Sequence, residues 1–433
     1  MQQIEAETKV RSSTLRGWFS ESPGKQKLPR DKESLLAVVH ALKRRVPKSS
    51  SLPPAIAMSD TGWVELQRRA KQGEAGSGKP GSGSARDWFA AEGMPLTFGG
   101  IDLGVQVLFG PLGSSWGSND IQALPMTAPW AAPAELVEFV KPYADQRGIY
   151  NGNCARLNRL DVVPYSADGV TEHHRLRLEM APTGYFDMLA TNFALGPFTT
   201  EGAPLLAGRS GLARTRLSNL VQTELVLITS DGQVPVFRRA DQMAMLQGCW
   251  QVSSGETLQL PADLAGTSGR PDLFKTALRG LDEETGLSST LVTDLAITAF
   301  VATPEFATVG VLMRGNLNCT AMELARRHSH SILNARDSWE HTGRDLLPID
   351  DVRELAKALT VRRWSKQSAS ALVYAHAERV GGHIEPLAQE IERNGGLMLD
   401  PGQRQDIIPR GLRDDLAKKY LFSGSAEESS TLA

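Results

Sequence analysis

The sequence predicts an α/β fold of the α+β kind, in which a mixed sheet packs against helices. Residues 224–229 and 234–239 are apolar strand patterns, and Asp231-Gly232 between them predicts a two-residue hairpin turn. Downstream, apolar residues within 273–281 recur at steps of three and four, which is the spacing of one buried helical face. Strands and a helix in one stretch predict a layered domain. A preceding α/β domain and a small N-terminal helical element are expected to accompany it.

Composition sets wide bounds on the protein class. The chain has 433 residues, which favours two to four domains, and its net charge of −2 gives no overall drive toward nucleic acid or membrane. Its start lacks a signal-peptide pattern, and no apolar run is long enough to span a bilayer. Three scattered cysteines fit a reducing compartment. We therefore expect a cytoplasmic protein without a membrane partner.

The first fifty residues are locally basic. Residues 10–19 have the pattern of a short helix with serine caps, and Asp31 opens a second helix. This segment, 1–50, resembles the second half of a helix-turn-helix domain of the Xre/Cro type, with the first helix missing. The resemblance implies DNA contacts, although a basic helical docking element remains the alternative. The implied DNA-binding residues are Ser12, Ser13, Thr14 and Arg16.

A linker and a second globular region follow. Residues 51–86 are rich in Ser, Pro and Gly and predict a flexible tether. Residues 87–216 predict an α/β domain of unknown role, with strands at 105–109 and 175–180 and a helix at 133–141. Two segments of this domain place polar side chains beside aromatic ones, which fits a ligand pocket but favours packing at a core edge. These segments are 151–157 and 185–192.

The most informative stretch is 277–287. It combines Arg279, an acidic triplet at 282–284 and Gly286, which predicts the C-terminal cap of a helix. Pro271 is expected in the first turn of this helix. Adjacent carboxylates near a helix C-terminus are disfavoured by the helix dipole, so a divalent cation with a preference for oxygen ligands would stabilise them.

This stretch resembles the second half of the Nudix box, R-E-U-x-E-E-x-G-U, in which U is aliphatic. Gly280 departs from the pattern, because the family has glutamate there. The first half departs further, since Gly255 lies roughly ten residues too far from Arg279, and an insertion is expected within 258–269. The resemblance implies a Nudix-like α/β/α sandwich with a mixed sheet, over residues 217–351. The matching residues are Arg279, Leu281, Glu283, Glu284, Gly286 and Leu287.

The resemblance also implies roles for individual residues. Glu283 and Glu284 would bind Mg²⁺ or Mn²⁺, and Arg279 would hold the carboxylates in place. Glu305 is a candidate for the role that Gly280 cannot fill, or else an ordinary loop acid. We expect Gly280→Glu to raise activity and to stabilise the helix, because glycine costs about 1 kcal/mol inside a helix. The substrate-binding residues implied are Arg239, Trp250 and Gly255.

Two functions of different classes follow. The first is Mg²⁺-dependent hydrolysis of a nucleoside diphosphate linked to another group. The alternative is a DNA-binding regulator whose Nudix-like domain senses a nucleotide without cleaving it, because a fold does not settle a function. A third possibility places the activity in residues 87–216. Beyond the Nudix-like region we expect C-terminal helices over 352–422 and a disordered tail over 423–433.

Overall fold

The structure is a computed structural model in which two compact units are distinguished. One unit comprises residues 1–82 and 161–176, and the other comprises 83–160 and 177–433. All side-chain contacts discussed below lie within the second unit. The expected DNA-binding element, the linker, Glu305 and the C-terminal tail lie outside the described residues. Those residues are 38, 94–98, 101–110, 112–165, 173–193, 212, 217–243, 245–266, 268–303, 308–331 and 335–400.

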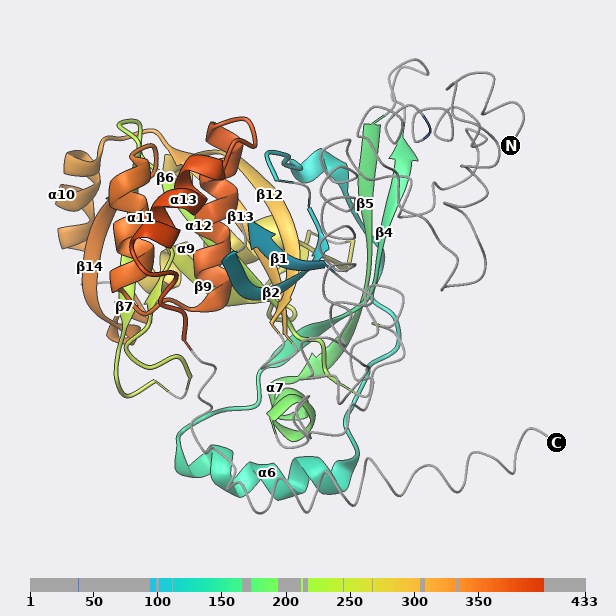
Figure 1. Ribbon diagram of the computed structural model, residues 1–433. Helices are drawn as coiled ribbons and strands as arrows, with labels where there is room; N and C mark the ends of the chain where they lie inside the picture. Colours follow the sequence, from blue (N-terminus) through green and yellow to red (C-terminus); the bar gives the residue numbers. More distant parts are fainter. Residues whose placement is uncertain are drawn as a thin grey trace, which may run out of the picture. The chain divides into compact units, whose positions relative to one another are not determined.

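A six-stranded mixed sheet organises the second unit (Figure 1). Strands β13 and β6 are parallel, whereas the other neighbours are antiparallel. The strands in sheet order are β1 (Met94–Phe98), β2 (Ile101–Phe109), β12 (Val292–Thr303), β13 (Thr308–Leu317), β6 (Val221–Ile228) and β9 (Ser254–Thr257).

Helices cover both faces of this sheet. The α9 helix (Leu273–Thr285) packs on β9 and β6, and α12 (Lys366–Arg379) packs on β2, β6, β12 and β13. Successive side chains of a strand point to opposite faces. Glu224 contacts Ser368 of α12, so its neighbours Thr223 and Leu225 face the side of α9. The predicted fold class, an α/β/α sandwich with a mixed sheet, is therefore confirmed.

The C-terminal helices belong to the same layered structure. The helices α11 (Val352–Val361) and α13 (Glu385–Arg393) pack together near α12 (Figure 1). Trp364, between α11 and α12, is fully buried and donates its indole N–H to the carbonyl of Ala358 at 2.9 Å. The strand β2 comes from the expected domain 87–216, the helix α12 comes from the expected C-terminal helices, and the remaining strands of the sheet, except β1, come from the expected Nudix-like region. Residues of all three expected segments therefore pack into one hydrophobic core.

A second, three-stranded sheet has the order β14 (His341–Pro348), β7 (Gln233–Arg239) and β8 (Trp250–Gln251). The β7 strand follows the predicted Asp-Gly turn, in which Gly232 takes a φ of 75°. It joins a different sheet from β6, so the two strands do not pair as the predicted hairpin. A two-stranded hairpin of β10 (Leu264–Ala265) and β11 (Arg270–Pro271) falls at the expected insertion. Other short elements are η5 (Ser289–Leu291), α10 (Ala321–Ser331) and η6 (Ser338–Glu340).

The region 112–193 adds a three-stranded sheet, one longer helix and shorter helical elements. The strands β3 (Ile121–Ala123), β5 (His173–Gly184) and β4 (Asn153–Tyr165) lie in that order. The helix predicted at 133–141 is α6 (Ala134–Gln146), and Pro133 is its N-cap. The segments 151–157 and 185–192, in which polar side chains lie beside aromatic ones, are joined by a hydrogen bond to the backbone. Asn151 Oδ1 accepts from the N–H of Phe186 at 2.8 Å. The short elements η2 (Ser118–Asp120), α7 (Tyr185–Met188) and a π-helical turn (Leu189–Phe193) complete the region.

Within the part of the chain that the structure describes, no helix is both long and apolar enough to cross a membrane.

Candidate functional site

The α9 helix carries the acidic residues of the candidate site. Asp272 begins it as the N-cap and accepts hydrogen bonds from the N–H groups of Phe274 and Lys275, both at 3.0 Å. Gly286 ends it with a left-handed φ of 66°, as predicted. Pro271 belongs to β11 and precedes the helix, because Asp272 takes the capping position. Leu273, Ala277 and Leu281 form the buried face.

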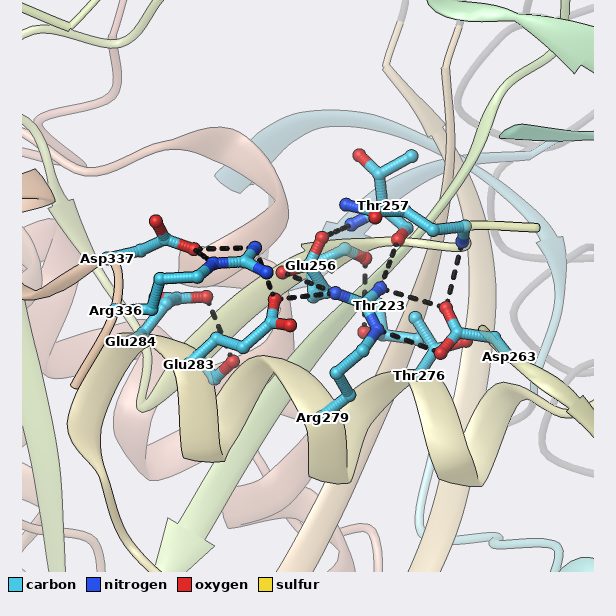
Figure 2. A network of polar contacts seen from close by, with 12 residues as sticks. Thr223, Glu256, Thr257, Asp263, Thr276, Arg279, Glu283, Glu284, Arg336 and Asp337 are labelled. Atoms are coloured by element: carbon cyan, nitrogen blue, oxygen red, sulfur yellow. Dashed lines mark hydrogen bonds and ion pairs between the residues drawn. The ribbon is translucent and has the colours of Figure 1, made fainter. Parts of the chain in front are cut away.

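Arg279 is the centre of a polar network on this helix (Figure 2). Its Nε and Nη2 atoms donate to the two carboxylate oxygens of Asp263, both at 2.8 Å, and Nη2 also donates to the carbonyl of Thr257 at 2.9 Å. Burial alone would lower the pKa of Arg279, but the hydrogen bonds that it donates to Asp263 and the charges of Glu256, Asp263 and Glu283 raise it. The guanidinium therefore remains charged and is held by the protein's own carboxylates.

Glu283 is bound by two arginines. Its Oε2 atom accepts from Nη1 of Arg279 at 2.7 Å and from Nη2 of Arg336 at 2.9 Å. Arg336 also contacts the carboxylate of its neighbour Asp337 at 3.0 Å (Figure 2). The positive charge that the helix end requires is thus supplied by guanidinium groups.

Gly280 packs against the edge strand β9. A Cβ atom at this position would lie 2.5 Å from Cβ of Glu256 and 2.8 Å from Oγ of Ser254. The expectation that Gly280→Glu stabilises the helix is therefore wrong, because the helix and strand are too close for any side chain. Glu256 fills this space and its Oε2 atom lies 3.3 Å from Nη1 of Arg279. Glu256 thus supplies a carboxylate to the network, whereas the helix has Gly280 where the Nudix box has glutamate.

Glu284 is buried and is bound by residues of β9. Its Oε1 atom accepts from Oγ of Ser254 at 3.0 Å and from the N–H of Gly255 at 3.1 Å. Burial raises its pKa to about 7, although Arg239, Gly255 and Ser254 oppose the rise. Burial likewise raises the pKa of Glu256 to about 8, against the opposing charge of Arg279 and with support from the charges of Glu284 and Glu283.

A chain of polar contacts leads from Glu284 to the three-stranded sheet. Gln251 Nε2 lies 3.3 Å from Oε2 of Glu284 and 2.7 Å from Nε2 of His341, and its Oε1 accepts from Nη1 of Arg239 at 2.9 Å. The amide oxygen of Gln251 faces Arg239, so its amide nitrogen faces His341. An amide nitrogen can only donate, so Nε2 of His341 accepts this hydrogen bond. Burial and then the charge of Arg239 lower the pKa of His341 to about 4, so the ring is neutral.

The predicted substrate residues separate into two groups. Gly255 and Arg239 lie in the network around Glu284. Trp250 lies elsewhere: successive strand residues face opposite ways, so Gln251 turns toward Glu284 while Trp250 packs on the other side. The indole of Trp250 lies 4.5 Å from the guanidinium carbon of Arg362 and 6.3 Å from the ring of Trp364.

The arrangement does not fit a divalent metal. The resemblance implies Mg²⁺ or Mn²⁺ on Glu283 and Glu284, but the two carboxylates are bound by different partners within the protein. Glu283 is bound by two guanidinium groups, and Glu284 is 4% exposed and hydrogen-bonded. Within the described ranges, no three or more His, Cys, Asp or Glu side chains form a group that could hold a metal ion. We therefore assign no metal to these residues.

Several residues of the network were not singled out from the sequence as site residues: Asp263, Gln251, Arg336 and His341. Asp263 lies in the insertion, where sequence spacing carries no information about the partner of Arg279. The sequence did offer one indication of such a partner, because a half-buried arginine requires carboxylates to balance its charge. Gln251 and His341 come from different strands of the second sheet, and only the register of that sheet brings them to Glu284.

A buried glutamate on the opposite face of the sheet leads to a pH prediction. Burial raises the pKa of Glu224 from 4.5 to about 7, although Oγ of Ser368 donates to it at 2.7 Å. The folded state holds this proton more tightly than the unfolded state. Protonated Glu224 therefore stabilises the folded state fully below about pH 4.5, and this stabilisation is lost as the pH rises through about 7.

We expect Glu224→Gln to remove this contribution and to raise the free energy of unfolding at pH 8 by on the order of 3 kcal/mol, at 1.36 kcal/mol per pKa unit. Urea denaturation from pH 5 to 8 measures the change, with the exposed Glu354→Gln as the control. A wild-type pH dependence that persists unchanged in Glu224→Gln would contradict the assignment.

Comparisons with known proteins found similar solved structures but no matching family model or curated protein. Among solved structures, DR0079 from Deinococcus radiodurans is 15% identical, with 32% of this chain and 71% of that chain covered and a TM-score of 0.22. A MutT protein from Methanosarcina mazei is 13% identical, with 37% and 91% covered and a TM-score of 0.25. Scores this low support no inference about function.

Proposed function

We propose that the Nudix-like region binds a nucleotide-type ligand, a nucleoside diphosphate with a further group attached, without hydrolysing it. The observation that carries this proposal is the state of Glu283, whose carboxylate is bound by both Arg279 and Arg336. The sequence resemblance supplies the ligand class. The arginines supply charge at the helix end, where the resemblance would place a metal.

Arg336 is the residue of this network best placed to meet an anion. Its side chain is 61% exposed, whereas that of Arg279 is 15% exposed and is bound by Asp263 and Glu283. Arginine presents a planar fork of donors that suits phosphate oxygens. We therefore propose that Arg336 contacts the diphosphate and that Arg279 serves to hold the carboxylates.

The alternative, Mg²⁺-dependent hydrolysis, is favoured by one observation. Glu256 and Glu283 both approach Nη1 of Arg279, at 3.3 Å and 2.7 Å, so two carboxylates do gather beside the helix. A metal there would lie beside the guanidinium charges of Arg279 and Arg336, which repel a cation. The geometry therefore favours binding over hydrolysis.

The test uses ADP-ribose and ADP with the full-length chain. We expect the affinity measured by titration calorimetry to be equal in Mg²⁺ and in EDTA, because no metal takes part. Chromatography should detect no AMP released over hours. Arg336→Ala should weaken binding by about tenfold, since a hydrogen bond to a charged group contributes roughly 1.5–3 kcal/mol. The exposed Arg353→Ala is the control.

Two results would decide against this proposal. Release of AMP that requires Mg²⁺ and is lost in Glu283→Gln would establish the hydrolase. Failure of both ligands to bind in either buffer would remove the nucleotide-type ligand altogether.

DNA binding is a separate proposal. It rests on the basic composition of residues 1–50 and on the helix-turn-helix resemblance, and Ser12, Ser13, Thr14 and Arg16 lie outside the described residues. We retain a DNA-binding regulator as the role that best combines such an element with a non-hydrolysing nucleotide sensor.

A further inference from the structure

A cavity of about 70 Å³ lies beside the start of α12, on the face of the sheet opposite the acidic helix. Its apolar wall is formed by Tyr185, Met188, Leu220, Met245 and Leu246. Tyr185, Met245 and Leu246 are only partly buried, so the wall reaches the surface. Pockets that enclose a drug-sized ligand measure about 300–1,000 Å³ and a cavity that encloses benzene about 150 Å³, so this one can hold the edge of a ring or a small group but no whole nucleotide.

The opposite wall is polar and largely uncharged. It carries two glutamines, Gln222 and Gln367, and the hydroxyls of Thr303 and Thr308. The charged lining residues are one lysine, Lys366, and one aspartate, Asp400, whose charges cancel. A wall without net charge offers no preference for an anion or a cation. Its ligand must therefore be selected by hydrogen bonding and by contact with the apolar wall.

The hydrogen bonds within this wall leave a defined set of groups available. Gln367 Nε2 donates to the hydroxyl oxygens of Thr303 and Thr308, at 3.2 Å and 3.4 Å. Those two oxygens lie 2.9 Å apart, so one hydroxyl donates its proton to the other. The second hydroxyl proton remains available for donation to a ligand. Gln222 Nε2 donates to Oε1 of Gln367. This leaves Gln222 one N–H and its carbonyl oxygen, which bond no other residue in the described ranges.

We propose that this cavity binds an uncharged planar group with an amide-type edge, which is found in nucleobases and in carboxamides. Such an edge presents a donor beside an acceptor, and the available groups of Gln222 and of the threonine hydroxyls complement both. The flat ring would lie against Tyr185 and Met188. The proposal is independent of the function assigned to the acidic helix, because the two sites lie on opposite faces of the sheet.

Matched ligand pairs test the proposal on the full-length chain. Uridine and nicotinamide represent the two sources of an amide edge. Their controls are N3-methyluridine, which lacks the amide N–H, and nicotinate, which replaces the amide by a carboxylate. We expect at least one amide ligand to bind about tenfold more tightly than its control, because an unpaired buried polar group costs roughly 1–3 kcal/mol. Chemical shifts followed by NMR titration measure the affinities.

A pair of variants locates the binding. Gln222→Met keeps the length of the side chain but removes its amide, and should weaken the binding about tenfold. Gln233→Met changes a partly buried strand glutamine in the other sheet and should have no effect. Thermal melts show whether each variant folds, and Thr308→Val supplies a second variant if Gln222→Met does not.

Each remaining outcome has one meaning. Equal affinity for both members of each ligand pair, no binding of any of them, or binding unchanged in both cavity variants would overturn the proposal. Binding of uridine or nicotinamide by a chain that fails to bind ADP-ribose would support the cavity and reject the function proposed for the acidic helix.

Discussion

Asp263→Asn is expected to lower the free energy of unfolding by about 3–5 kcal/mol, the usual cost of breaking a buried ion pair by removing one partner. The carboxylate of Asp263 is fully buried and accepts two hydrogen bonds from Arg279. Its Oδ2 atom also accepts from the N–H of Gln259 at 2.8 Å. Asparagine would place an NH₂ group against one of these donors and would remove the most buried of the three carboxylates that balance the guanidinium charge.

Urea denaturation at pH 7 measures this loss. The control is Asp345→Asn, which removes a pair with Arg362 in which the aspartate side chain is 45% exposed. Exposed pairs contribute only about 0–1 kcal/mol. Similar losses in both variants would show that Asp263 is not the main support of Arg279.

Gly280→Glu is expected to destabilise the fold by at least about 1–3 kcal/mol, the usual cost of overpacking a core. The side chain would overlap Glu256, whose Cβ atom lies 2.5 Å from the position of the new Cβ. Replacing glycine in a helix gains about 1 kcal/mol, which does not offset such an overlap. The double variant Gly280→Glu with Glu256→Gly moves the carboxylate from the strand to the helix and removes the collision with Glu256, which leaves Oγ of Ser254 as the remaining close neighbour.

We expect this double variant to be more stable than Gly280→Glu alone, with a coupling of about 0.5–3 kcal/mol between the two positions. Thermal and urea unfolding of the two single variants and the double variant complete the cycle. Gly117→Ala serves as the control, because the nearest atom to its new Cβ would be 3.7 Å away. If the effects of the two substitutions on the free energy of unfolding were additive, the side chains at positions 280 and 256 would not compete for the same space.

The double variant also relates stability to function. It restores the glutamate that the Nudix resemblance expects beside Arg279. If hydrolysis of ADP-ribose appeared only in this variant, the loss of that glutamate would be the reason that the natural chain binds without turnover.

The sequence by itself determined the elements of this protein. The apolar spacing within 273–281 and the glycine at 286 predicted α9 and its end, because helix periodicity and left-handed caps are local properties. The Asp-Gly pair predicted the turn before β7 for the same reason. The family resemblance identified Arg279 and Glu283 as partners, and the helix places them at i and i+4.

Only the tertiary structure decided how these residues are used. Asp263, Glu256 and Arg336 reach the helix from an insertion, an edge strand and a loop, and no spacing in the sequence relates them to Arg279. The burial of Glu284 depends on the register of β9, which brings Ser254 and Gly255 beneath it. Whether a carboxylate meets a metal or a guanidinium depends on such long-range packing, because sequence motifs specify side chains but not their neighbours.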